Sequence, residues 1–161
     1  MKLIIARHGE AEMFSSSGMD RNRQLTEKGK SDILKMSLFI QKSPIKINQI
    51  YYSPYDRTRN TAEIFSQNIG METKLIEENC LAPGGNYDSI LKRICSFSNS
   101  EGILLVGHNP DVSFFAAKLI QDPTLSHNLI FQPGTTIALN IAREKFCNGQ
   151  ILWVLSPDFL G

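Results

Sequence analysis

Short apolar segments alternate with amphipathic ones along this chain, and this alternation is the feature that most constrains its fold. Gly102–Gly107 (GILLVG) is the clearest apolar segment, with the length and composition of a fully buried strand. The strands that we expect are Lys2–Ala6, Ile47–Tyr52, Thr73–Ile76, Gly102–Gly107, Thr136–Ala142 and Gln150–Leu155. Alternating strands and helices predict an α/β fold, a three-layer sandwich with a mostly parallel central sheet and helices on both faces.

The segments between these strands have helical periodicity. Thr26 is the predicted N-cap of the first helix, which ends near Gln41. Its apolar face is expected to contain Ile33, Met36, Leu38, Phe39 and Ile40. Further helices are expected at Asp56–Asn68, Tyr87–Phe97 and Asp111–Ile120, with turns at Pro83–Gly85 and Arg143–Gly149. Because we find no repeat and no low-complexity tract, we expect one domain over residues 1–161.

Composition excludes several classes of partner. The 161 residues carry a net charge of +1, so the basic face typical of a nucleic-acid-binding protein is not expected. No apolar run is long enough to span a bilayer, and Met1–Ala6 is too short for the apolar region of a signal peptide. The cysteines, an odd number without a close pair, predict reduced thiols rather than disulfides: Cys80, Cys95 and Cys147. We therefore expect a cytoplasmic protein that binds neither nucleic acid nor a membrane.

Three chemically suggestive segments each follow a predicted strand. They are Arg7–Gly9, Ser53–Pro54 with Arg57 close behind, and His108–Pro110. In open parallel sheets, ligands bind beyond the carboxyl ends of the strands. We therefore expect these segments to meet at one edge of the sheet and to form a site there.

Two histidines with several arginines suit a phosphoryl group. Arginine presents a planar fork of donors that matches phosphoryl oxygens, and it keeps its charge. A histidine nucleophile must be neutral, and nearby arginines favour this because they lower the pKa of an imidazole. Its second ring nitrogen needs an acceptor, for which a backbone carbonyl of the turn is the expected group. Arg59 and His127 are expected on the surface, and Trp153 is expected to pack against other side chains. Gly134–Thr136 is expected to form a structural turn at the start of the strand that follows.

These segments resemble the motifs of a known family. Arg7–Ala11 (RHGEA) is similar to the Arg-His-Gly motif of the histidine phosphatase, or phosphoglycerate-mutase-like, superfamily. Ser53–Ala62 (SPYDRTRNTA) and Gly107–Pro110 (GHNP) resemble its second block and its late histidine block. The short chain, Arg23–Gly29 (RQLTEKG) and the GHNP form are typical of the SixA-type phosphohistidine phosphatase branch.

The resemblance implies a phosphoglycerate-mutase-like fold and a role for each matching residue. His8 would be the nucleophile that forms a covalent phosphohistidine, Arg7 and Arg57 would bind the phosphoryl oxygens, and His108 would donate to the phosphoryl group. Arg23 would be a further phosphate ligand, with Arg21 as the competing candidate. No cofactor and no metal ion are expected. The implied partner is a phosphohistidine-containing protein, such as a histidine phosphotransfer domain in signal transduction, and we expect a monomer.

The identity of the general acid bears on the substrate. A phosphomonoester expels a poor alkoxide leaving group and needs such an acid, whereas the imidazole of a phosphohistidine leaves more readily. Neither Glu77 nor Glu78 aligns clearly with the glutamate that relatives acting on metabolites use, and Gly70–Asn86 is too short for a lid. Both features favour a phosphohistidine substrate. Two alternatives remain: a phosphomonoesterase for small metabolites that uses Glu77 or Glu78 as the acid, and a phosphate-recognition module without turnover.

Other phosphatase chemistries do not fit this sequence. A cysteine phosphatase needs Cys, five residues and Arg, but Asn86, Glu101 and Trp153 stand at the arginine positions. No two aspartates have the Asp-x-Asp spacing of aspartyl phosphotransferases, and no glycine-rich loop ends in Lys-Ser or Lys-Thr. A metallophosphatase would need more histidines and aspartates than this chain has.

Overall fold

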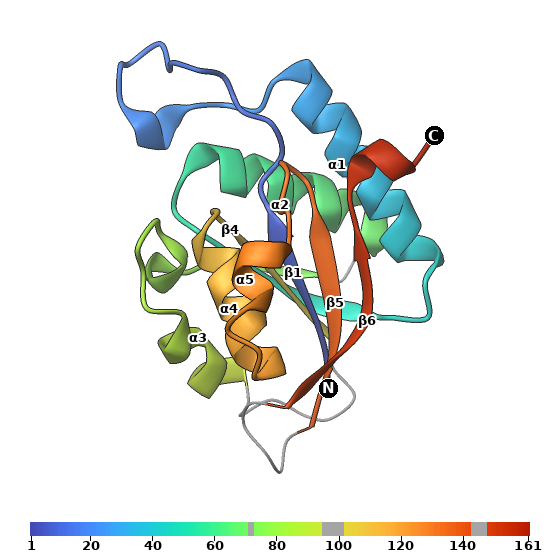
Figure 1. Cartoon of the computed structure of the whole chain (residues 1–161). Coiled ribbons are helices and arrows are strands. Elements are labelled where there is room, and N and C mark those ends of the chain that lie inside the picture. Colours follow the sequence, from blue (N-terminus) through green and yellow to red (C-terminus); the bar gives the residue numbers. More distant parts are fainter. Residues whose placement is uncertain (71–72, 95–101, 143–147) are drawn as a thin grey trace.

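A single six-stranded sheet forms the middle layer of the protein (Figure 1). The structure is a computed structural model that describes residues 1–70, 73–94, 102–142 and 148–161. The strand order is β3-β2-β4-β1-β5-β6. The strands are β1 (Lys2–Arg7), β2 (Ile47–Tyr52), β3 (Lys74–Glu77), β4 (Gly102–Gly107), β5 (Thr136–Ile141) and β6 (Gly149–Leu155). The first four run parallel, and β5 and β6 are antiparallel to their neighbours, which confirms the predicted α/β class.

Helices cover both faces of this sheet. In Figure 1, α1 (Glu27–Lys42) and α2 (Asp56–Ile69) lie behind it, and α3 (Tyr87–Ile94) and α4 (Asp111–Ile120) lie in front. A four-residue helix, α5 (Leu125–Asn128), packs against α4. The predicted three-layer sandwich is therefore confirmed.

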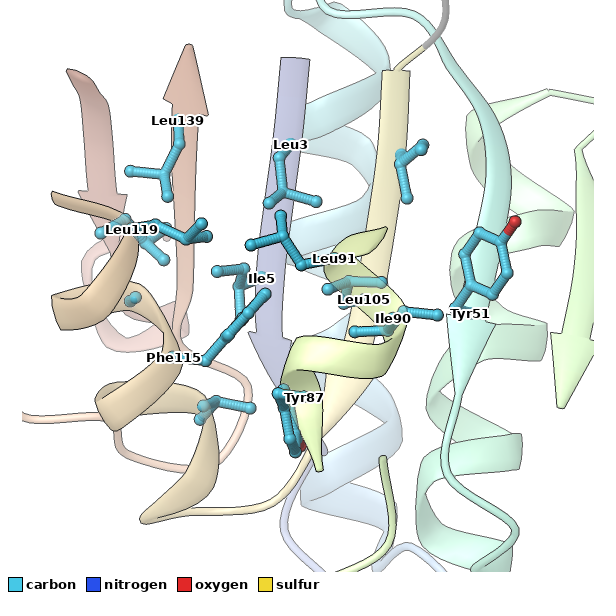
Figure 2. Close-up of a cluster of buried hydrophobic side chains, with 14 of the residues drawn as sticks. Leu3, Ile5, Tyr51, Tyr87, Ile90, Leu91, Leu105, Phe115, Leu119 and Leu139 are labelled. Carbon is cyan, nitrogen blue, oxygen red and sulfur yellow. The ribbon is translucent and has the colours of Figure 1, made fainter. Parts of the chain in front are cut away.

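The alternation of side chains along the central strands creates two separate cores. On β1, Leu3 and Ile5 face the layer of α3 and α4, while Ile4 and Ala6 face that of α1 and α2. Figure 2 shows Leu3 and Ile5 in the first core, together with Leu105 of β4 and side chains of α3 and α4. Because burial of each large apolar side chain contributes about 1.5–3 kcal/mol, these two cores fix the central strands firmly.

Most of the predicted boundaries are confirmed to within one residue. β2, β4 and α4 have the predicted ends, and the Thr26 side chain caps α1 by accepting from Gly29 N at 3.0 Å. The prediction for Leu38 is wrong: its side chain is exposed, because it lies outside the buried stripe of α1 that contains Ile33, Met36 and Ile40. Trp153 packs against Phe39 as expected, with ring centroids 5.2 Å apart.

Several expectations fall on residues outside the described ranges. Phe97, the predicted end of the third helix, is one of them, and so are residues 143–147 of the predicted hairpin turn. Cys80 is a free thiol, whereas Cys95 and Cys147 are not described. In the described part of the chain, no helix is long and apolar enough to cross a membrane.

Four short helical segments of the described chain were not predicted. They are the 3-10 turns η1 (Asp20–Asn22), η2 (Asn79–Leu81) and η3 (Pro157–Phe159) and the four-residue helix α5. None is long enough for its side chains to show a helical period in the sequence. η1 supplies Asp20, which accepts hydrogen bonds from Arg57.

Candidate active site

The sheet brings the three predicted segments together because β4 lies between β1 and β2. Arg7 at the end of β1 pairs with Gly107 of β4, and Tyr52 at the end of β2 pairs with Val106. The residues that follow these strands therefore project from adjacent carboxyl ends. The rings of His8 and His108 meet edge to face with centroids 5.2 Å apart. This confirms that the segments share one edge of the sheet.

His8 is held in a single tautomer by the chain next to it. Its Nδ1 lies 2.7 Å from the carbonyl oxygen of Gly9. A carbonyl oxygen can only accept, so Nδ1 carries the hydrogen and Nε2 keeps its lone pair. The expected backbone acceptor is thus present. Arg57 Nε donates toward this Nε2 at 3.3 Å, so the free lone pair faces the guanidinium.

Arg57 comes from the first turn of α2 and is buried at the centre of the site. Its guanidinium lies 4.7 Å from the centroid of the Tyr55 ring. Nη1 donates to the backbone oxygen of Asp20 at 2.8 Å, and Nη2 donates to the Asp20 carboxylate at 3.0 Å. A buried cation needs such a partner because an unpaired one is costly. The η1 turn, which supplies Asp20, therefore neutralises the central arginine of the site.

The loop arginines differ in their relation to this centre. Arg23 donates from Nη1 to the Asp20 carboxylate at 2.9 Å and from Nε to the Glu12 carbonyl. Asp20 thus joins Arg23 to Arg57, and both arginines hold the pKa of the Asp20 carboxyl below its usual value, Arg23 most strongly. Arg21 is exposed and reaches only the Pro54 carbonyl, at 3.5 Å. Of the two candidates, Arg23 is the one that the structure connects to the site.

Arg7 is anchored by a different segment from the one that holds Arg57 and Arg23. Its Nη1 donates to the carbonyl oxygen of Phe131 at 2.6 Å. Its Nε is buried and has no hydrogen-bond partner among the described residues. The predicted turn is present before β5: Gly134 N donates to His8 O, and Arg7 N donates to Thr135 O, both at 3.0 Å. This turn therefore fixes the backbone of the Arg7-His8 segment.

His108 is paired with Ser53, for which the sequence predicted no role. Its Nε2 lies 2.8 Å from Ser53 Oγ, and both side chains are buried. The Tyr55 ring contacts the imidazole edge to face at a centroid distance of 5.0 Å. His108 Nδ1 is buried and has no hydrogen-bond partner within the described residues.

Both imidazoles are neutral at physiological pH. Burial, the largest cause, lowers the pKa of His8 to about 4; the hydrogen bond to the Gly9 carbonyl, the second largest, opposes it, and the charges of Arg57, Arg7 and Arg23 lower it further. Burial likewise lowers the pKa of His108 to about 3, helped by His8 and Arg57. The predicted direction is confirmed, but burial and not the arginine charge is the largest cause.

Thr61 of α2 links the Arg7–Gly9 segment to Arg57. Its hydroxyl accepts from Gly9 N at 3.1 Å and donates to the carbonyl of Arg57 at 2.8 Å. Sequence reasoning missed this role, as it missed those of Asp20, Ser53 and the Phe131 carbonyl. The position of Ser53 and Thr61 inside the quoted serine-proline block was the only signal available for them.

The remaining predicted residues are exposed or partly exposed. Arg59 donates to the Glu77 carboxylate at 3.0 Å on the partly exposed side of α2, as its predicted surface position requires. His127 is exposed, as expected. Glu77 is also exposed, and its carboxylate is engaged by Arg59. Within the described residues, no group of three or more His, Cys, Asp or Glu side chains could hold a metal ion.

Comparisons with known proteins agree with this geometry. A SixA protein histidine phosphatase, solved in complex with tungstate, superposes with a TM-score of 0.87 at 22% identity over 100% of both chains. A putative phosphohistidine phosphatase SixA from Agrobacterium tumefaciens gives a TM-score of 0.81 at 19% identity over 97% of both chains. At these identities the likeness shows a shared fold.

Sequence comparison adds evidence for the family. The phosphohistidine phosphatase SixA homolog of Haemophilus influenzae is 28% identical over 128 residues, which are 74% of this chain and 77% of that protein. The profile of the histidine phosphatase superfamily (branch 1) matches residues 3–82, a range that contains Arg7, His8 and Arg57. Together with the paired histidines at the edge of a phosphoglycerate-mutase-like sheet, this match shows that the chain belongs to the histidine phosphatase superfamily.

Proposed function

We propose that this phosphatase removes the phosphoryl group from phosphohistidine on a protein partner, through a covalent intermediate on Nε2 of His8. One observation carries the proposal: Nε2 of a neutral, buried imidazole keeps its lone pair beside Arg57, while Nδ1 donates to Gly9 O. This is the state that a histidine nucleophile needs.

The reaction has two steps in this proposal. The His8 Nε2 lone pair forms a bond to phosphorus as the P–N bond of the substrate breaks, and the substrate imidazole leaves with a proton from solvent. Water then attacks the phosphohistidine at His8, which releases inorganic phosphate and returns the neutral imidazole. Arg7 and Arg57 stabilise the charge on the transferring oxygens, as loose phosphoryl-transfer transition states require.

The surroundings of the site support a phosphohistidine substrate. Glu77, one of the two candidate acids, is exposed, and its carboxylate is bound by Arg59. An imidazole leaving group has less need of a general acid than an alkoxide has. The names of the SixA relatives point to the same substrate class. A histidine phosphotransfer domain or a similar protein in signal transduction is our proposed partner, and we propose a monomeric enzyme.

Comparison of two substrate classes tests this proposal. We expect the protein, in excess EDTA, to release phosphate from a phosphohistidine-bearing protein with a kcat/KM at least about 100-fold above that for sugar phosphates. His8→Ala should abolish this activity because it removes the attacking nitrogen, whereas His127→Ala, at an exposed histidine, should not change it. Faster cleavage of sugar phosphates would indicate a phosphomonoesterase for small metabolites. Binding of phosphate without any turnover would indicate a phosphate-recognition module.

A matched pair of arginine substitutions tests the role of Arg57. Arg57→Ala should lower kcat/KM by about 100- to 1000-fold, the usual effect of losing one charge-stabilising donor. Arg59→Ala, two residues along α2 and bound to Glu77, should change kcat/KM less than about twofold. Unfolding curves should show that both variants are folded. Equal effects of the two substitutions would show that Arg57 is not a phosphoryl ligand.

Acid titration tests the neutrality of the two imidazoles. Below an unfolded-state pKa of about 6.5, the unfolded chain binds protons that the folded His8 and His108 do not bind until pH approaches about 4 or 3. Stability is therefore lost as the pH falls, by up to about 1.4 kcal/mol per pH unit for each histidine. We expect His8→Gln to reduce the slope of the unfolding free energy between pH 6.5 and 5, as measured by urea denaturation. An unchanged slope would mean that His8 is not held neutral.

A further inference from the structure

Ser53 is a buried hydroxyl at the centre of the site whose only hydrogen-bond partner, in the part of the chain that the structure describes, is His108 Nε2 at 2.8 Å. It follows β2 directly, and its backbone N donates to Val106 O of β4 at 3.3 Å. Because β4 leads into His108, this bond sets the serine side chain against the imidazole. The pair is therefore positioned by the sheet and not by a loop.

The proton inventory of this pair is limited. Burial holds His108 neutral, so the imidazole has one N–H and one lone pair to share between two nitrogens. If Nε2 carried the hydrogen, the Ser53 hydroxyl proton would have no acceptor among the described residues, and Nδ1 would present a lone pair. If Ser53 donates to Nε2, its proton is satisfied and Nδ1 carries the hydrogen. A buried unpaired polar group costs about 1–3 kcal/mol, which favours the second arrangement.

His108 Nδ1 is the atom that this arrangement leaves available. It is buried without a partner among the described residues, although the imidazole ring contacts the ring of His8. A buried donor of this kind in a native site is explained by a ligand that accepts from it. A phosphoryl oxygen between the two rings would be such an acceptor. In the other tautomer, Nδ1 would carry a lone pair, which would repel the phosphoryl oxygen.

We propose that Ser53 is a positioning residue: its hydroxyl donates to His108 Nε2 and thereby fixes the tautomer in which Nδ1–H donates to the transferring phosphoryl group. The proposal rests on the proposed function for the identity of the acceptor. The tautomer itself is a property of the protein without substrate, so it can be measured whether or not turnover is found.

The tautomer is measured by proton–nitrogen NMR of the imidazoles at pH 7, in the free full-length protein. In the wild type, we expect the His108 couplings of an Nδ1–H, Nε2-unprotonated ring. Ser53→Ala should convert His108 partly or wholly to the Nε2–H form, while His8 keeps its Nδ1–H through the Gly9 carbonyl. Observation of Nε2–H on His108 in the wild type would overturn the proposal.

Kinetics separates positioning from packing. Ser53→Ala should lower kcat toward phosphohistidine protein by about 10- to 100-fold with a KM change below about threefold, because a transition-state donor is disordered. Ser37→Ala, which removes an equally buried serine hydroxyl from α1, should leave both constants unchanged. Ser53→Thr, if unfolding curves show it folded, should restore the hydroxyl and the wild-type tautomer.

The outcomes distinguish the two proposals. A wild-type Nδ1–H signal without turnover of any substrate would reject the proposed function and leave the tautomer assignment intact. Normal turnover with equal kcat values for Ser53→Ala and Ser37→Ala would reject the role of Ser53 and leave the proposed function intact.

Discussion

The position of β4 between β1 and β2 is the constraint on which the rest of the site depends. Main-chain pairing places Arg7 opposite Gly107 and Tyr52 opposite Val106, so the three strands end side by side. Three side chains of the site do not have to reach far, because each follows a strand directly: His8, Ser53 and His108. The two apolar cores on either face hold these strands rigid, and the site inherits this rigidity.

Burial then determines the charges of the site. It removes both imidazoles from water and makes their neutral forms the stable ones, which a nucleophile requires. The same burial would penalise the charge of Arg57, and the Asp20 carboxylate offsets this penalty. Asp20 accepts hydrogen bonds from Nη1 and Nη2 of Arg57, through its backbone oxygen and its carboxylate, and so holds the guanidinium in place.

The sequence predicted the fold and the meeting of the three segments at one edge of the sheet, because both are encoded in local patterns. The apolar run Gly102–Gly107 and the polar segments at strand ends required no knowledge of long-range contacts. Asp20 could not be found in this way, since its role depends on a loop that folds back 37 positions along the chain to reach Arg57. Leu38 was placed in the core because periodicity alone cannot set the width of a buried stripe. The carbonyls of Gly9 and Phe131 belong to the backbone, so the residue types at these positions do not indicate which hydrogen bonds the carbonyls accept.

The central claim is that His8 accepts the phosphoryl group, and trapping of the intermediate tests it most directly. The enzyme would be mixed with a protein carrying ³²P-phosphohistidine, quenched in alkali within milliseconds, and digested for peptide mapping. If His8 is the nucleophile, an acid-labile, alkali-stable label is expected on the peptide that contains His8, and no label in His8→Ala. Label on His108 or Ser53, or turnover without any labelled enzyme, would contradict it.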